Sequence, residues 1–135
     1  MSDQGAYTRD LSVAGTFEEV VERTVAALAD EGFGVMWEVD ARATFDEKLG
    51  ESFRPYLILG ACAPDLAYEG LGIEPRLGGL LPCNTVVQET EGDLIEVNVV
   101  DPVVLLGLVD NAALDQVVEE VSERLDRVVD AIAAA

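Results

Sequence analysis

The stretch TVVQETEGDLIEVNV, residues 85–99, is the part of the sequence that indicates the fold most directly. Ile95, Val97 and Val99 alternate with polar residues, which is the period of a strand with one buried face. Glu91-Gly92-Asp93 is a turn sequence, and residues 85–89 before it favour a second strand. The stretch therefore predicts a β-hairpin within an antiparallel sheet.

Two amphipathic helices are predicted, one far before this hairpin and one after it. Thr16 and Glu19 have the spacing of a capping box, and Gly32 is placed to end the first helix. The last helix carries a continuous apolar stripe at helical period. The stripe consists of Leu114, Val117, Val118, Val121, Leu125, Val128, Val129 and Ile132. Both helices are expected to cover the sheet.

Further strands are predicted at residues 7–13, at residues 35–39 and at residues 54–61, the last as a strand buried on both faces. Thr44 and Glu47 repeat the capping-box spacing before a short turn that ends near Gly50. Pro64 is expected in the first turn of another helix, ended by Gly72.

The segments after that helix complete the order of elements. Residues 78–82 are expected to form a loop, and a short apolar piece follows Pro102. The resulting order predicts an α+β fold, an antiparallel sheet with helices packed on one face and extra short helices. Residues 1–135 are interpreted as a single domain. The second face of such a sheet needs cover, and a homodimer is the simplest cover.

The charge balance excludes several classes of function. The chain has 27 acidic residues, 8 basic residues and no histidine, for a formal net charge of −19. We therefore expect no nucleic-acid partner and no binding to anionic membranes, and histidine chemistry is excluded. The acids are dispersed over a chain that is 50% hydrophobic, which suggests a haloarchaeal-type protein. At molar salt the Debye length falls to about 3 Å, so self-repulsion is screened.

No signal or membrane-spanning segment is expected in the sequence, and we interpret the protein as cytoplasmic. Its two cysteines, Cys62 and Cys83, are expected to be thiols there. Both lie where a loop meets a regular element, and the helix field near Cys62 favours a thiolate. Two thiolates could hold a soft cation such as Cu(I), supply part of a zinc shell or act as a redox pair. Alternatively, each cysteine is a small buried hydrophobe.

A few other side chains are candidates for the same site. Arg54 could clamp a carboxylate, or form a structural ion pair. Tyr68 could line a pocket together with Tyr56, or pack in the core. Asn84 could orient a ligand or cap a loop, and Trp37 is expected in the core or a dimer interface.

The segment around the two cysteines resembles a known family. LGESFRPYLILGACAPDLAYEGLGIEPRLGGLLPCN, residues 49–84, is similar to the family catalogued as domain of unknown function 302. The resemblance rests on the Arg-x-Tyr-x-Ile-Leu-Gly-Ala-Cys-x-Pro run from Arg54 and on the Gly-x-x-Leu-Pro-Cys-Asn run that ends at Asn84. It implies a strand-helix-four-strand-helix fold, similar to a single TATA-binding-protein-like repeat, and a dimer. It supplies no activity, but it places both cysteines in one pattern.

These observations lead to one main hypothesis and two alternatives. The main hypothesis is a small cytoplasmic, dimeric binding module that holds a small molecule or a soft metal near Cys62 and Cys83, with Arg54, Tyr68 and Asn84 as further candidate ligands. The first alternative is a thiol-dependent redox enzyme, which requires a lowered cysteine pKa. The second is a purely structural or regulatory dimer.

Overall fold

A computed structural model of the chain describes residues 6–91 and 94–134. Five strands form one antiparallel sheet in the order β1-β5-β4-β3-β2. The strands are β1 (Thr8–Val13), β2 (Gly34–Asp40), β3 (Tyr56–Cys62), β4 (Cys83–Thr90) and β5 (Leu94–Val100). The helices are α1 (Phe17–Asp30), α2 (Ala41–Leu49), α3 (Pro64–Ile73), α4 (Pro102–Leu106) and α5 (Asp115–Ala134), with short 3-10 helices η1 (Pro75–Leu80), η3 (Gly107–Val109) and η4 (Ala112–Leu114). The predicted α+β class is confirmed.

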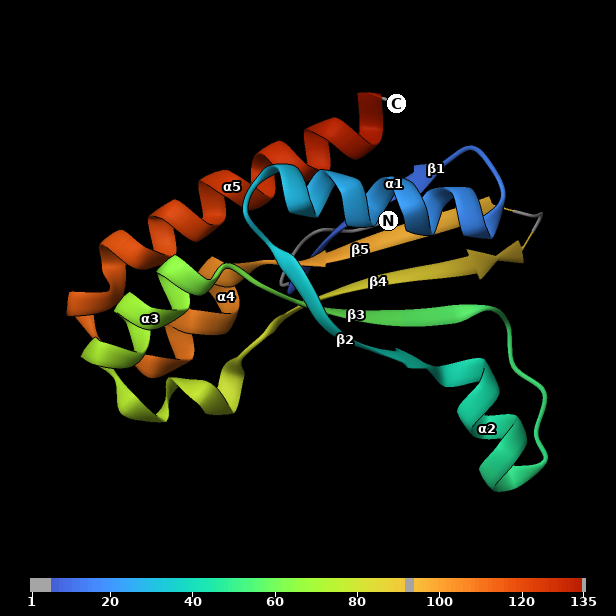
Figure 1. Ribbon diagram of the computed structural model, residues 1–135, viewed down its shortest axis with the longest axis horizontal. Coiled ribbons are helices and arrows are strands. Elements are labelled where there is room, and N and C mark those ends of the chain that lie inside the picture. The colour runs from blue at the N-terminus through green and yellow to red at the C-terminus, as the bar shows by residue number, and fades with distance from the viewer. Residues whose placement is uncertain (1–5, 92–93, 135) are drawn as a thin grey trace.

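The hairpin and the last helix form as the sequence indicated. β4 and β5 pair in antiparallel register, with Val87 opposite Val97, while Gly92 and Asp93 of the expected turn lie outside the described residues. α1 and α5 pack side by side on one face of the sheet (Figure 1). The stripe of α5 supplies the buried residues Val117, Val121, Leu125, Val128 and Ile132. The main core therefore lies between this face and the two long helices.

The start of α1 confirms the predicted capping box. Thr16 Oγ1 accepts a hydrogen bond from the backbone N–H of Glu19 at 3.2 Å, and Glu19 Oε1 accepts one from the N–H of Thr16 at 2.9 Å. These bonds satisfy amides that have no partner in the first turn. At the other end the chain leaves the helix through Gly32, whose φ of +84° suits glycine.

The start of α2 differs from the prediction. The helix begins at Ala41, and its cap is Asp40, whose Oδ1 accepts from the N–H of Ala43 at 2.9 Å. The expected capping box at Thr44 is wrong, because Thr44 lies inside the helix and donates its hydroxyl to the Asp40 carbonyl oxygen. Asp40, one turn before Thr44, is an equally good capping residue, and the helix begins after it. The helix ends at Gly50 as expected and projects away from the sheet (Figure 1).

The sheet face opposite α1 and α5 is called the open face below. Alternation and register place these strand residues on it: Thr8, Asp10, Ser12, Gly34, Trp37, Val39, Tyr56, Ile58, Gly60, Cys62, Asn84, Val86, Gln88, Thr90, Leu94, Glu96, Asn98 and Val100, with Gly34 and Cys62 at the end of the sheet. On β3, Leu59 and Ala61 are buried on the helix side, while on the open face Gly60 is buried beneath Trp37 and Tyr56 and Ile58 are half-buried. The prediction of burial on both faces fails at Tyr56 and Ile58, which are only half-buried because α1 and α5 both lie on the opposite face. Trp37 is 43% exposed here, outside the core.

The elements around α3 form a second, smaller core at one end of the molecule. α3 begins at Pro64 as predicted, and the expected loop at residues 78–82 is partly helical, since η1 runs to Leu80. Leu77, Leu106 and Leu114 form the buried centre of this cluster. No helix within the described ranges is long and apolar enough to cross a membrane. The two cysteines lie where this end cluster meets the sheet.

Candidate functional site

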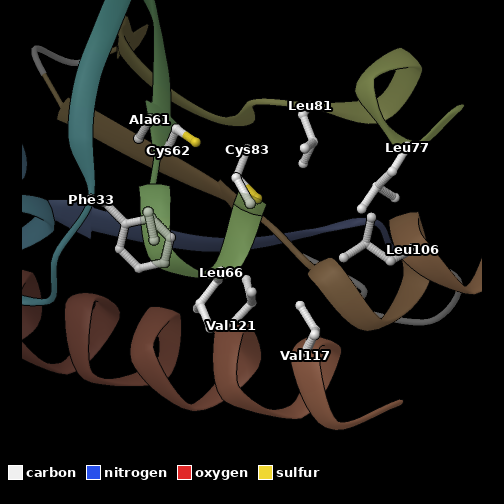
Figure 2. A pocket seen from close by; sticks show the side chains of 12 residues that line it. Phe33, Ala61, Cys62, Leu66, Leu77, Leu81, Cys83, Leu106, Val117 and Val121 are labelled. Atoms are coloured by element: carbon white, nitrogen blue, oxygen red, sulfur yellow. The ribbon is translucent and has the colours of Figure 1, made fainter. Parts of the chain in front are cut away.

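Cys62 and Cys83 line one cavity of about 30 Å³. In the sheet Cys83 pairs with Ala61, so Cys62 is one residue beyond the register partner of Cys83. The rest of the wall is apolar and comes from α3, α4, α5, η1 and the residues beside β2 and β3. It consists of Phe33, Ala61, Ala63, Leu66, Ala67, Leu77, Leu81, Leu106, Val117 and Val121 (Figure 2).

Both cysteines are free thiols, and burial decides their protonation. Burial, assisted by the neighbouring Cys62, raises the pKa of Cys83 to about 11. Burial first, and then the Asp65 carboxylate, raise the pKa of Cys62 as well. Loss of hydration and a neighbouring negative charge both oppose the thiolate expected at the start of α3.

Asp65 connects the cavity to α5. Its Oδ2 accepts a hydrogen bond from Arg124 Nη2 at 2.8 Å, and its Oδ1 accepts one from Nη1 at 3.3 Å. The hydrogen bond from Arg124 lowers the pKa of Asp65, so this carboxylate stays charged beside Cys62. Arg124 also donates to Glu120 at 3.0 Å. The charge that opposes thiolate formation is thus held in place by an ion pair.

The size and lining of the cavity limit what it can hold. The cavity is small, since about 10–15 Å³ of buried space already holds one water molecule, so it admits a guest of only a few heavy atoms. An organic ligand would have to displace the packed aliphatic side chains. Among residues 6–91 and 94–134, no group of three or more His, Cys, Asp or Glu side chains is arranged to bind a metal. The donors that the cavity itself offers are the two sulfur atoms.

Arg54 and Tyr68 do not lie at the cavity. Arg54 Nε donates to Gln88 Oε1 at 3.0 Å, and its guanidinium stacks over Phe53 at 4.5 Å from the ring centroid. Within the described part of the chain no carboxylate pairs with it, and its partners there are an amide and two aromatic rings. Tyr68 is 86% exposed on α3, which contradicts both the pocket and the core packing expected for it.

Asn84 lies on the open face, away from its neighbour Cys83 on β4. It lines a groove of about 420 Å³, called the open-face groove below. The groove is lined by Tyr7, Thr8, Trp37, Ile58, Gly79, Leu80, Leu81, Pro82, Asn84, Val86, Asn98, Val100 and Leu105. Sequence reasoning missed it because the predicted strand began at residue 85, whereas β4 begins at Cys83 and so carries Asn84 and Val86 on one face.

The fold and the thiol-lined cavity define a small α+β protein with a one-sided sheet. Residues 9–132 match the family model described as "Domain of unknown function DUF302", and the chain belongs to this family. A solved structure, the uncharacterized conserved protein DUF302 from Bacillus stearothermophilus, is similar to it with a TM-score of 0.86 and 29% identity. The match covers 94% of this chain and 98% of that one. No curated protein matches the chain.

Proposed function

We propose that the protein is a small binding module that holds one soft monovalent metal ion, Cu(I), between Cys62 and Cys83. The supporting observation is that both cysteines line a single apolar cavity of about 30 Å³. The small volume, with two sulfur atoms as its donors, favours a single soft ion over an organic ligand. Thiolates are the ligands that Cu(I) prefers.

The binding step is a ligand exchange without electron transfer. Two S–H bonds break, two Cu–S bonds form, and both protons pass to solvent. Because burial keeps the two thiols protonated near neutral pH, the ion must displace those protons. Apparent affinity should therefore rise with pH, by up to about 100-fold per pH unit when two protons are released. The Asp65 charge beside Cys62 is balanced by Arg124, which limits repulsion at the site.

Competition against a colorimetric Cu(I) chelator under anaerobic conditions tests the proposal. We expect one ion per chain in the native protein and an affinity that rises steeply between about pH 7 and pH 8. Cys62→Ser and Cys83→Ser should each weaken binding by at least about 100-fold, because a hydroxyl is a poor ligand for a soft ion.

Asn84→Ala is the matched control, since Asn84 is adjacent to Cys83 but points to the open face. It should bind Cu(I) like the wild type. Circular dichroism on each variant checks that the fold is kept. A wild-type chain that takes no Cu(I) up to about pH 9, or a Cys83→Ser variant with unchanged affinity, would exclude the site.

The two alternative functions receive less support. A thiol-dependent redox enzyme needs an activated thiolate, and the pKa of each cysteine is raised instead. A purely structural or regulatory protein would keep its cellular function in a double Cys→Ala variant, whereas the metal-binding proposal requires that function to be lost.

We also infer a setting for this activity, a reducing cytoplasm at molar salt. The support is the dispersed excess of 27 acidic over 8 basic residues and the two free thiols. The free energy of unfolding should rise as KCl is raised from the millimolar to the molar range. Stability that is independent of salt would contradict this setting and leave the cysteine site unaffected.

A further inference from the structure

The open-face groove has the size and the lining of a small-molecule site. Its volume of about 420 Å³ falls within the range of about 300–1,000 Å³ that is usual for such pockets. Ile58, Val86 and Val100 line it from the sheet, and residues 79–82 together with Leu105 line it from the end cluster. None of the described residues in its wall is charged. A molecule with an apolar body therefore fits the groove.

Trp37 gives the groove an aromatic surface in a fixed position. The indole lies flat against β3, because a Cβ at Gly60 would be 2.6 Å from Trp37 Cε2. The side chain is nevertheless 43% exposed, and Tyr7, next to β1, lines the same groove. The face of an indole attracts cations, and it also stacks on planar rings. This surface therefore favours a planar ring, above all one that carries a positive charge.

The hydrogen-bond donors at the β1 and β5 end of the groove are already taken by carboxylates. Thr8 Oγ1 donates to Asp10 Oδ1 at 2.9 Å. Asn98 Nδ2 donates to Asp10 Oδ1 at 2.6 Å and to Glu96 Oε2 at 3.0 Å. A hydroxyl has one hydrogen to donate and an amide nitrogen has two, so Thr8 and Asn98 keep no donor for a ligand. This end of the groove offers a guest acceptors and negative charge.

The charge around the groove also favours a cation. Asp10 and Glu96 are half-buried beside the groove, and the chain as a whole carries a net charge of −19. Arg54 does not line the groove and reaches the same network only through Gln88, to which it donates at 3.0 Å. A field of this sign raises the local concentration of cations and lowers that of anions.

We propose that the open-face groove binds a small organic cation with a planar aromatic body. Its ring lies on Trp37, and its positive charge is stabilised by Asp10 and Glu96. An uncharged or anionic molecule of the same shape fits the volume but lacks this stabilisation. Leu81 is the one residue of the described chain that lines both the groove and the cysteine cavity, so this site goes beyond the proposed metal binding and does not depend on it.

Three probes with the same bicyclic ring separate the effect of charge from that of shape. They are 1-methylquinolinium, which is a cation, quinoline, which is uncharged near neutral pH, and quinoline-2-carboxylate, which is an anion. Isothermal titration calorimetry in molar KCl measures their affinities, and the nuclear magnetic resonance signals of the Trp37 and Asn98 side-chain N–H groups locate the bound probe. We expect 1-methylquinolinium to bind at least about 5-fold more tightly than quinoline, and the carboxylate to bind more weakly than either.

Variants of Trp37 test the aromatic surface. Trp37→Ala should weaken the binding of 1-methylquinolinium by at least about 5-fold, and Trp37→Phe, which keeps an aromatic face, should recover part of that loss. Met36→Ala is the matched control, because Met36 is the preceding residue on β2, is 69% exposed and does not line the groove. It should bind the cation like the wild type.

A double variant tests the two carboxylates. Asp10→Asn/Glu96→Gln removes their charges and keeps their shapes, so the protein should then bind 1-methylquinolinium and quinoline about equally well. Glu22→Gln/Asp130→Asn removes as much charge from exposed positions of α1 and α5, across the sheet from the groove, and should keep the preference of the wild type. Cys83→Ser should also keep it, which separates this site from the metal site.

Several results would overturn the proposal. One is a wild type that binds quinoline or quinoline-2-carboxylate as tightly as 1-methylquinolinium. Another is a Trp37→Ala variant with unchanged affinity for the cation. A wild type that takes up none of the probes at about 10 mM would overturn it too, including one in which a second copy of the chain fills the groove and excludes them.

Discussion

The protonation of Cys83 gives the sharpest test of the cavity. Only a thiolate reacts with iodoacetamide, and burial raises the pKa of this thiol to about 11. Near pH 8 such a thiol is about 0.1% ionised, whereas a thiol with a pKa near 9 is about 10% ionised. Cys83 should therefore react at least about 100-fold more slowly in the folded chain than in the unfolded chain, before any steric protection is counted.

The assay is timed alkylation of the native protein, followed by mass spectrometry of the peptides that contain each cysteine. The chain unfolded in guanidinium provides the reference rate for both. Cys62, which is less buried, should react at an intermediate rate. The rate for Cys83 should keep rising with pH beyond about pH 10 instead of levelling off near its unfolded pKa. A plateau near pH 9, or equal rates in both states, would refute the burial argument.

The same pKa links Cys83 to the stability of the fold. Its folded pKa lies above its unfolded value, so the stabilising contribution is complete below about pH 9 and is lost as pH rises toward 11. The loss amounts to about 2–3 kcal/mol when the pKa values differ by about two. The free energy of unfolding of the wild type, measured relative to Cys83→Ala, should fall by about this amount over that range. A constant difference between the two proteins would contradict the assignment.

Three further changes test the packing. Thr24 is buried and donates its hydroxyl to the Val20 carbonyl oxygen at 2.7 Å. Thr24→Val leaves that carbonyl its helical hydrogen bond, so in urea titrations it should change the free energy of unfolding by less than about 1 kcal/mol. Thr24→Ala also leaves a space in the core and should cost about 1–2 kcal/mol more. Asp40→Ala removes the cap of α2 and should destabilise that helix by about 1 kcal/mol in hydrogen exchange. Gly60→Ala should displace the Trp37 indole and red-shift its emission, because the two would overlap.

Local signals in the sequence determined most of the secondary structure. The alternation of Ile95, Val97 and Val99 predicted β5, and the stripe at helical period predicted α5, because one buried face imposes a period on the chain that forms it. The Thr16–Glu19 capping box predicted the start of α1, because both of its partners lie within one turn. The start of α2 was missed because Asp40 and Thr44 are equally good local candidates, and only the end of β2 selects between them.

The relations between distant residues were decided by the tertiary structure. Cys62 and Cys83 share a cavity because Ala61 of β3 pairs with Cys83 of β4. Other registers of these two strands would separate the two cysteines, and the sequence alone does not select the register. The pKa of each thiol is raised first by burial, which depends on the side chains that pack around it in the tertiary structure. Arg54 has an amide partner and two aromatic neighbours, although carboxylates are plentiful in the chain. A periodic pattern records which residues face a core, but it does not record which strand or helix lies on the other side.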